Sequence, residues 1–287
     1  MQIGIGLPNT IPSPPGTLLV DWARRAEERG FTGLATIDRI VYPGYDSLTT
    51  LAAVAGATTR IGLLTNILLA PAYPPILLAK VAASIDQLSN GRLTLGLAPG
   101  SRADDYTATG RDFHHRGREL DVGLDVLHRA WRGEPVGGGE HAVTPTPVRE
   151  RRVSILIGGN SDRTIRRAVT WGAGWTSGGA GADQAGRFAE RVRTAWRAAG
   201  RDGEPRLATL AYFSLGDEAE ADSRAYLRHY YGYAGPAAEH IADGALRSPT
   251  AIRDAVKAFE DAGLTELYLN PTVASLDQID RLADVVL

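Results

Sequence analysis

The chain contains no cysteine among its 287 residues. This absence excludes disulfide bonds, thiolate-ligated metal sites and a cysteine nucleophile. The first residues, MQIGIGLPN, lack the basic segment and the long apolar core of a signal peptide. No apolar run approaches the roughly 18 residues that a membrane-spanning helix needs. We therefore expect a cytoplasmic protein that has no membrane partner.

Motifs of several common enzyme classes are also missing. The chain has neither a GxSxG nucleophile elbow nor a Walker lysine motif, and its 6 histidines show no HExxH or other metal-ligand spacing. We therefore predict that the protein holds no metal ion. Charge is balanced, with 31 Lys and Arg against 33 Asp and Glu and no basic tract, which argues against nucleic acid as a partner.

Short apolar segments alternate with segments that have the period of amphipathic helices. We predict strands at residues 3–7, 34–37, 61–65, 93–97, 153–157, 174–175, 207–215 and 267–269. Helical segments follow nearly all of them, including a long one at 218–243, and the stretch 133–151 has no periodicity. This pattern predicts an α/β fold: a (β/α)8 TIM barrel formed by a single domain over residues 1–287, with loop insertions.

An open doubly wound sheet is the alternative fold. It would carry a dinucleotide-binding turn with three spaced glycines after its first strand. The segment GIGLPN has the first two glycines, but Asn9 stands where the third belongs. The fingerprint fails, and the barrel is favoured.

The sharpest local signal follows the predicted strand 153–157. Two glycines there let the backbone approach a ligand, and a helix begins with polar residues whose N–H groups and hydroxyls could cradle a phosphate. The residues of this candidate cofactor site are Gly158, Gly159, Asn160, Ser161 and Thr164. An ordinary helix N-cap preceded by turn glycines explains the same residues equally well.

Two further strand ends carry candidate cofactor-binding residues. Since ligands gather at the carboxyl ends of parallel strands, polar and glycine residues there are candidates. They are Thr65, Asn66 and Ile67 after the third strand, and Ala98, Pro99, Gly100 and Ser101 after the fourth. A plain βα turn is the alternative for both segments. The tyrosines at 226–233 could line a pocket or face the core, and the core is the safer interpretation.

Candidate catalytic residues are sparse. Asp38 and Arg39 place an acid beside a base at the end of the second strand, where they could polarise a ligand. A solvated strand end explains them as well. His114 and His115 follow the loop after the fourth strand, where a general acid or base would be useful. The exposed start of a helix is the alternative.

Several of these segments together resemble the bacterial-luciferase-like family of flavin and deazaflavin oxidoreductases. The resemblance rests on GFTGLATIDR, SLTTLAAVAGATTRIGLLTNILLAP, DQLSNGRLTLGLAPG and VSILIGGNSDRTIRRAVTWGAGW, and covers most of the chain. It implies a (β/α)8 barrel. It also implies that Asn66-Ile67 forms a bulge behind the flavin ring, often through a non-proline cis peptide. Ala98 to Ser101 would run beside the ring and ribityl chain. Asn160, Ser161 and Thr164 would hold the cofactor phosphate.

The chain departs from relatives of this family at three positions. Many relatives have a histidine where Arg39 stands, some have a glutamate at Ser101, and a luciferase-type relative has an arginine at Pro99. The acid and base sets of those relatives therefore do not transfer, and the proton donor is unassigned.

The resemblance implies three possible functions. The first is a monooxygenase that uses reduced FMN and O2 on a small organic substrate, with a separate flavin reductase as partner. The second is a reductase or dehydrogenase that exchanges a hydride with coenzyme F-420. The third is a non-catalytic flavin-binding paralogue. The resemblance also implies a homodimer.

Overall fold

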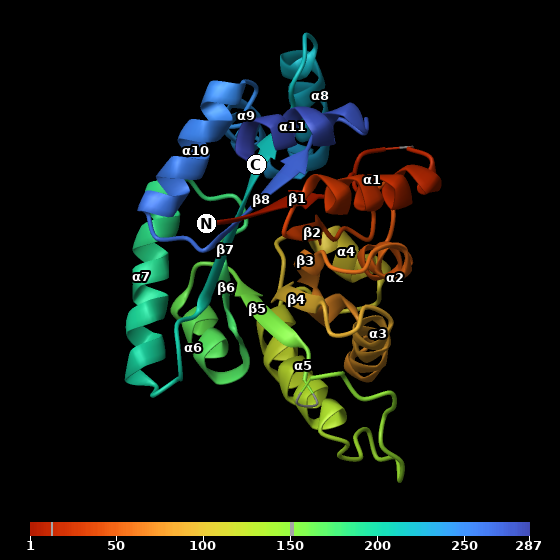
Figure 1. The fold of residues 1–287 in the computed structure, drawn as a ribbon. Coiled ribbons are helices and arrows are strands. Elements are labelled where there is room, and N and C mark those ends of the chain that lie inside the picture. The colour runs from red at the N-terminus through yellow and green to blue at the C-terminus, as the bar shows by residue number, and fades with distance from the viewer. Residues whose placement is uncertain (13, 150–151) are drawn as a thin grey trace.

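The computed structural model describes residues 1–12, 14–149 and 152–287. Within these residues, parallel strands form a closed barrel in the order β1 to β8 (Figure 1). The strands are β1 (Gln2–Gly6), β2 (Gly33–Thr36), β3 (Gly62–Leu69), β4 (Leu93–Ala98), β5 (Ser154–Gly158), β6 (Gly174–Thr176), β7 (Arg206–Phe213) and β8 (Glu266–Pro271). The pairing of β1 with β8, with Gln2 opposite Glu266, closes the barrel. The predicted (β/α)8 TIM barrel is confirmed.

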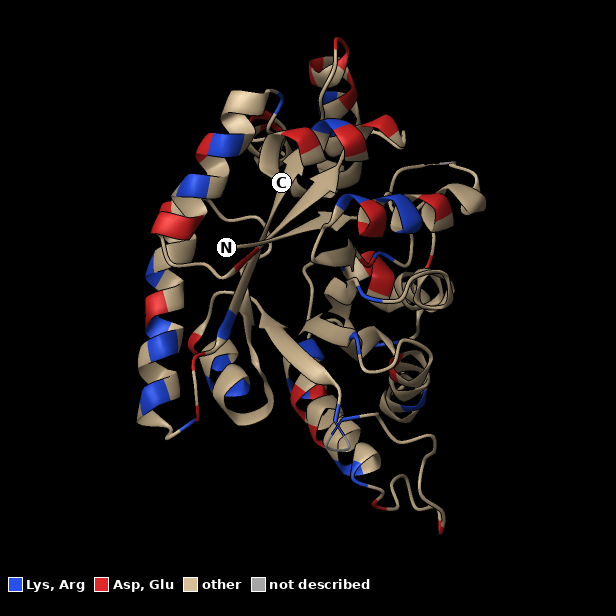
Figure 2. Ribbon diagram, in the orientation of Figure 1, with Lys and Arg blue, Asp and Glu red and all other residues tan. Residues whose placement is uncertain are grey.

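Helices surround the barrel on its outside (Figure 1). They are α1 (Gly16–Arg29), α2 (Ser47–Ala57), α3 (Pro75–Leu88), α4 (Ala103–Ala108), α5 (Arg116–Trp131), α6 (Asp162–Trp171), α7 (Ala182–Ala198), α8 (Ala219–Tyr231), α9 (Ala237–Asp243), α10 (Pro249–Asp261) and α11 (Asp277–Val286), with 3-10 turns at η1 (Ala70–Ala72) and η2 (Gly232–Ala234). Figure 2 shows that charged residues gather on the helices, whereas the strands carry very few. Strands buried on both faces have this composition.

Side chains fill the barrel interior in layers. Leu64, Leu156, Leu210 and Tyr268 form part of one buried apolar cluster there. The ring of Tyr268 needs space that β1 provides, because a Cβ atom at Gly4 would lie 2.4 Å from the ring. The interior is therefore a packed core, and ligands can reach only its ends.

Three details differ from the sequence predictions. The predicted helix 218–243 is broken into α8 and α9 by η2 and by Gly235, which has φ +57°. The six-residue α4 was not predicted. β3 extends to Leu69 instead of ending at residue 65, because it resumes after a bulge. The stretch 133–151 contains no helix or strand in its described part, and residues 150–151 lie outside the described residues.

Candidate active site

The bulge in β3 lies between Thr65 and Leu68, where the pairing with β4 shifts its register. The Asn66–Ile67 peptide is cis, as the resemblance implied. Asn66 is buried, and its Oδ1 accepts a hydrogen bond of 2.8 Å from Thr176 Oγ1 of β6. Its Nδ2 has no hydrogen-bond partner among the described residues. A buried donor without a partner is the kind of group that a bound ligand satisfies.

A cavity of about 740 Å³ begins at this bulge. It joins three segments that the sequence predicted separately as cofactor-binding. The predicted residues that line it are Ile67, Ala98, Pro99, Gly100, Ser101, Gly159 and Asn160. Trp175 of β6 and Phe188 of α7 form its opposite wall, and their rings lie 4.8 Å apart. The fold therefore brings the carboxyl ends of β3, β4 and β5 to one ligand-sized space.

The start of α6 lies at one end of this cavity. Ser161 is the N-cap: its Oγ accepts the backbone N–H of Thr164 at 3.3 Å, and Thr164 Oγ1 accepts the N–H of Ser161 at 3.5 Å. This capping box confirms the N-cap alternative. Gly159 has φ +117°, and a Cβ atom there would lie 2.8 Å from Thr164 Oγ1. Only glycine fits this turn, and the phosphate role of the segment stays a prediction.

Five of the predicted cofactor residues do not line the cavity: Thr65, Asn66, Gly158, Ser161 and Thr164. Thr65 is fully buried, and its hydroxyl donates to the carbonyl of Gly96 at 3.0 Å, which ties β3 to β4. Gly158 is buried where a Cβ atom would lie 3.1 Å from both Ile67 and Ala98. Thr65 and Gly158 shape the cavity wall from behind.

Asp38 lies at the end of β2, with its carboxylate directed to the segment after the bulge. Its Oδ2 accepts the N–H of Leu69 at 2.9 Å, and its two oxygens lie 3.0 and 3.2 Å from the donating hydroxyl of Tyr73. Burial raises the pKa of Asp38 to about 7, and the charges of Asp46 and Asp105 add to the effect. Asp38 is therefore a titratable group in the neutral range, fixed by two donors.

Arg39 extends to the opposite side of the loop. Its Nη1 donates to the carbonyl of Tyr230 at 2.8 Å, and its guanidinium lies 4.4 Å from the ring centre of Tyr42. Its Nη2 lies 3.6 Å from a carboxylate oxygen of Asp104. Arg39 thus fastens the β2 loop to the end of α8 and to α4.

His114 and His115 are exposed at the start of α5. His115 Nδ1 lies 2.6 Å from Asp112 Oδ2, and the His114 ring packs edge-on against Phe113. Neither histidine lines the 740 Å³ cavity. Their catalytic role stays a prediction, and their position gives it no support.

Sequence reasoning missed part of the site. Arg187 and Arg191 of α7 line the cavity, but the sequence of an amphipathic helix does not tell which exposed residues border a ligand. Asn270 of β8 is 2% exposed, and its side-chain nitrogen and oxygen have no partner among the described residues. Gly6 makes room for it, since a Cβ atom there would lie 2.0 Å from Asn270 Oδ1. A polar residue at a strand end was the available signal for Asn270.

The tyrosines of α8 are mostly core residues. Tyr226 and Tyr230 are buried, whereas Tyr233 is 46% exposed. Tyr226 shares a hydrogen bond of 2.7 Å with Thr10, and Tyr212 shares one of 2.7 Å with Tyr231. The core interpretation is confirmed for Tyr226 and Tyr230.

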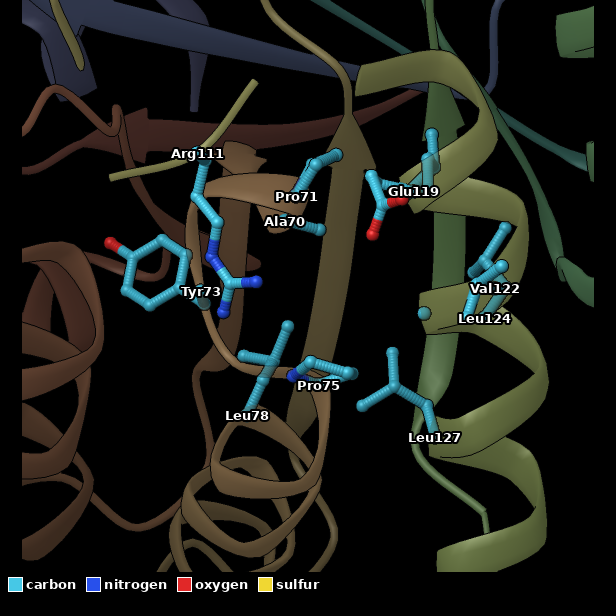
Figure 3. Close-up of a pocket in the computed structure, with 12 residues that line it drawn as sticks. Ala70, Pro71, Tyr73, Pro75, Leu78, Arg111, Glu119, Val122, Leu124 and Leu127 are labelled. Carbon is cyan, nitrogen blue, oxygen red and sulfur yellow. The ribbon is translucent and has the colours of Figure 1, made fainter. Parts of the chain in front are cut away.

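A second, much smaller cavity lies between α3 and α5 (Figure 3). Its volume of about 20 Å³ holds about one water molecule. Apolar side chains such as Leu78 and Leu127 line it, with Arg111 and Glu119 at its border (Figure 3). None of the predicted site residues contributes to it. Asp38 and Arg39 line a different cavity, of about 530 Å³, and most of the predicted cofactor residues line the 740 Å³ cavity, which is the candidate cofactor site.

The described residues contain no group of three or more His, Cys, Asp or Glu side chains that could hold a metal ion. In the same part of the chain, no helix has the length and apolarity needed to cross a membrane.

The chain is similar to known proteins over its whole length. The family model of luciferase-like monooxygenases matches residues 1–286. An uncharacterized protein of Mycobacterium tuberculosis is 27% identical over 212 residues, which are 64% of this chain and 73% of the relative.

Two solved structures share the fold. An F420-dependent secondary alcohol dehydrogenase in complex with an F420-acetone adduct has a TM-score of 0.79 at 17% identity, covering 99% of this chain and 98% of the other. The oxygenating constituent of 3,6-diketocamphane monooxygenase from Pseudomonas putida, in complex with FMN, has a TM-score of 0.76 at 18% identity, covering 99% and 96%. From the match over residues 1–286, the chain belongs to the luciferase-like monooxygenase family.

Proposed function

We propose that the 740 Å³ cavity binds reduced FMN and that the protein uses it with O2 to oxygenate a small organic substrate. The observation that carries this proposal is the meeting of Ile67, the 98–101 loop and the Gly159–Asn160 turn before α6 around one space. The resemblance assigned these three segments to the ring, the ribityl chain and the phosphate. The family membership and the fold shared with an FMN-bound monooxygenase support the same cofactor.

The residues present fit such a cofactor. Asn66 Nδ2 is a buried donor that lacks a partner among the described residues, close to where the ring would lie. Gly159 permits a turn that a Cβ atom would prevent by its contact with Thr164 Oγ1. First-turn N–H groups of a helix have no intrahelical partner, and α6 begins at Asp162, two residues after Asn160, which lines the cavity.

Each part of the site has a proposed task. Ile67 supports the ring, and Ala98 to Ser101 border the ribityl chain. Asn160, Ser161 and Thr164 hold the phosphate. Trp175 and Phe188 exclude water from one wall, which protects reactive species from hydrolysis. The bound flavin supplies the oxygen chemistry, and the protein orients it and shields it.

The proposal includes a partner and an assembly. A separate flavin reductase supplies the reduced FMN. The protein acts as a homodimer, as the resemblance implied. Exposed Leu77 and Leu88 lie on one face of α3 and are 54% and 64% exposed, which offers an apolar surface for a second copy.

A second candidate function is hydride exchange with coenzyme F-420. The cavity continues past the start of α6 to Arg187 and Arg191, which gives space and positive charge for a longer anionic side chain. The same fold occurs in an F420-dependent dehydrogenase, which supports this second candidate.

Binding and turnover separate the candidates. We would titrate the protein with FMN, reduced FMN and coenzyme F-420, and follow O2 consumption with reduced FMN over a panel of small organic substrates. Tight binding of reduced FMN and substrate-dependent O2 uptake are expected. Tight binding of coenzyme F-420 alone would overturn the FMN proposal in favour of hydride exchange. Flavin binding without any turnover would indicate the non-catalytic paralogue.

A further inference from the structure

We infer that Arg187 and Arg191 of α7 form an anion-binding end of the cofactor cavity, which contacts the negatively charged side chain of the coenzyme. Both residues line the 740 Å³ cavity, as the 98–101 loop does. This inference rests on the proposed cofactor site, and adds a subsite that selects for charge. No motif in the sequence pointed to either residue.

The geometry brings the Arg191 guanidinium to the start of α6. Helices α6 and α7 pack side by side (Figure 1). Arg191 forms an ion pair with Asp162, the first residue of α6, and its guanidinium lies 5.1 Å from the ring centre of Phe188. Arg187 precedes Arg191 by four residues and therefore lies on the same face of α7. The two arginines thus line the same cavity as Gly159 and Asn160, the residues that lead into α6.

The charges in this region are unequal. Arg187 and Arg191 line the cavity, and no Asp or Glu side chain does. Asp162 is an opposing charge at the start of α6, and Arg191 pairs with it. Arg187 has no ion-pair partner among the described residues, so its charge is free for a ligand. Together with the positive end of the α6 dipole, this favours an anion.

Two coenzymes offer the required chemistry. FMN carries a terminal phosphate, and coenzyme F-420 carries a phosphodiester followed by carboxylates. Riboflavin and the deazaflavin without its tail have the same rings and lack the phosphate and carboxylate groups of the side chain. A subsite that contacts the charged side chain binds FMN more tightly than riboflavin, and coenzyme F-420 more tightly than the tailless deazaflavin. A site that contacts the ring alone binds both members of each pair equally.

Binding titrations of FMN and riboflavin to the full chain test this inference. We expect Arg187→Ala to weaken FMN binding by about tenfold, the size of one lost charge-assisted contact, and to change riboflavin binding by less than about twofold. The affinity for FMN should also fall less steeply with salt in this variant. Arg197→Ala is the matched control, because Arg197 lies on α7, pairs with Glu190 and does not line the cavity.

A second variant should strengthen FMN binding instead of weakening it. Asp162→Asn removes the opposing carboxylate and releases Arg191, so we expect FMN to bind more tightly and riboflavin to bind unchanged. Arg191→Ala should weaken FMN binding more than Arg187→Ala does, because it also leaves Asp162 unpaired beside the phosphate. Weaker binding of FMN to Asp162→Asn would contradict the inference.

The remaining outcomes are decisive as well. Equal losses of FMN and riboflavin affinity in Arg187→Ala, or no loss of either, overturn the subsite and leave the cofactor proposal intact. If only coenzyme F-420 binds the unaltered protein, the titrations are carried out with coenzyme F-420 in place of FMN and with the tailless deazaflavin in place of riboflavin. The same criteria then apply. If no coenzyme binds, the proposed function fails. In that case we would titrate both Arg187→Ala and the unaltered protein with inorganic phosphate. If phosphate binds the two proteins with equal affinity, the anion-binding subsite is overturned independently of the proposed function.

Discussion

Thr176 and Asn66 are joined by a hydrogen bond inside the barrel, from the Thr176 hydroxyl to Asn66 Oδ1 at 2.8 Å. Thr176 lies on β6 and Asn66 at the bulge of β3, so the bond links strands that are not neighbours in the sheet. Both side chains are buried, with exposures of 0% and 2%. The bond fixes the orientation of the Asn66 amide and leaves its Nδ2 group available to a ligand.

Replacing this threonine should loosen the bulge. Thr176→Val keeps the volume but removes the donor, so Asn66 Oδ1 is left buried and unsatisfied. We expect the free energy of unfolding to fall by about 1–3 kcal/mol, measured by urea denaturation. Affinity for the coenzyme should fall as well, because the amide is no longer held. Thr176→Ser keeps the hydroxyl and should restore the affinity; if Thr176→Val binds the coenzyme as tightly as the unaltered protein, the Asn66 amide makes no ligand contact.

The pKa of Asp38 predicts a pH dependence of stability. Burial raises this pKa from its ordinary value of 3.8 to about 7. Between these values the folded protein holds a proton that the unfolded chain releases, so stability falls as pH rises from about 4 to about 7 and then levels off. The loss is at most about 4 kcal/mol, since one pKa unit corresponds to about 1.4 kcal/mol.

Asp38→Asn removes this titration. We expect its melting temperature, relative to that of the unaltered protein, to rise between about pH 4 and about pH 7 and then to level off. Asp104→Asn is the control, because Asp104 is an exposed acid of α4 that pairs with Arg39, the residue next to Asp38. A difference between Asp38→Asn and the unaltered protein that does not vary with pH would show that Asp38 ionises at its ordinary pKa.

The sequence predicted the barrel because the spacing of apolar residues in each helix and strand, and the residues that end each strand, can be recognised locally. The apolar runs of β1 to β8, and the polar residues that end them, are visible without any tertiary contact. The helix α4 was not visible, because six residues carry no period and tertiary contacts hold it in place. Asp105 of α4 accepts the N–H groups of Ile40 and Val41 at 2.9 and 2.8 Å.

The candidate site was also predicted only in part. Ile67 and the segments 98–101 and 159–160 were found because each follows a strand. Arg187 and Arg191 were not, because their role depends on how α7 packs against α6. The direction of Asp38 was also hidden, because its partners Leu69 and Tyr73 come from another loop.

Ser161→Ala tests the proposed phosphate cradle at α6. The variant loses the cap of Thr164 N–H, which should lower the free energy of unfolding by about 1 kcal/mol. If the hydroxyl also contacts phosphate, affinity for FMN should fall several-fold, while affinity for riboflavin should stay the same. Ser248→Ala removes the equivalent cap from α10 and controls for stability alone. Unchanged FMN affinity in Ser161→Ala would refute the cradle.

The proposed homodimer predicts how α3 responds to charge. Leu77 and Leu88 are apolar and exposed on one face of this helix, and a second copy of the chain would bury them. Leu77→Glu places a carboxylate in that interface, so we expect the sedimenting mass to drop from about twice the chain mass of 30.6 kDa to the single chain. Val122→Glu changes an exposed apolar residue of α5 in the same way and serves as the control. A mass unaffected by Leu77→Glu would show that this face of α3 lies outside any dimer interface.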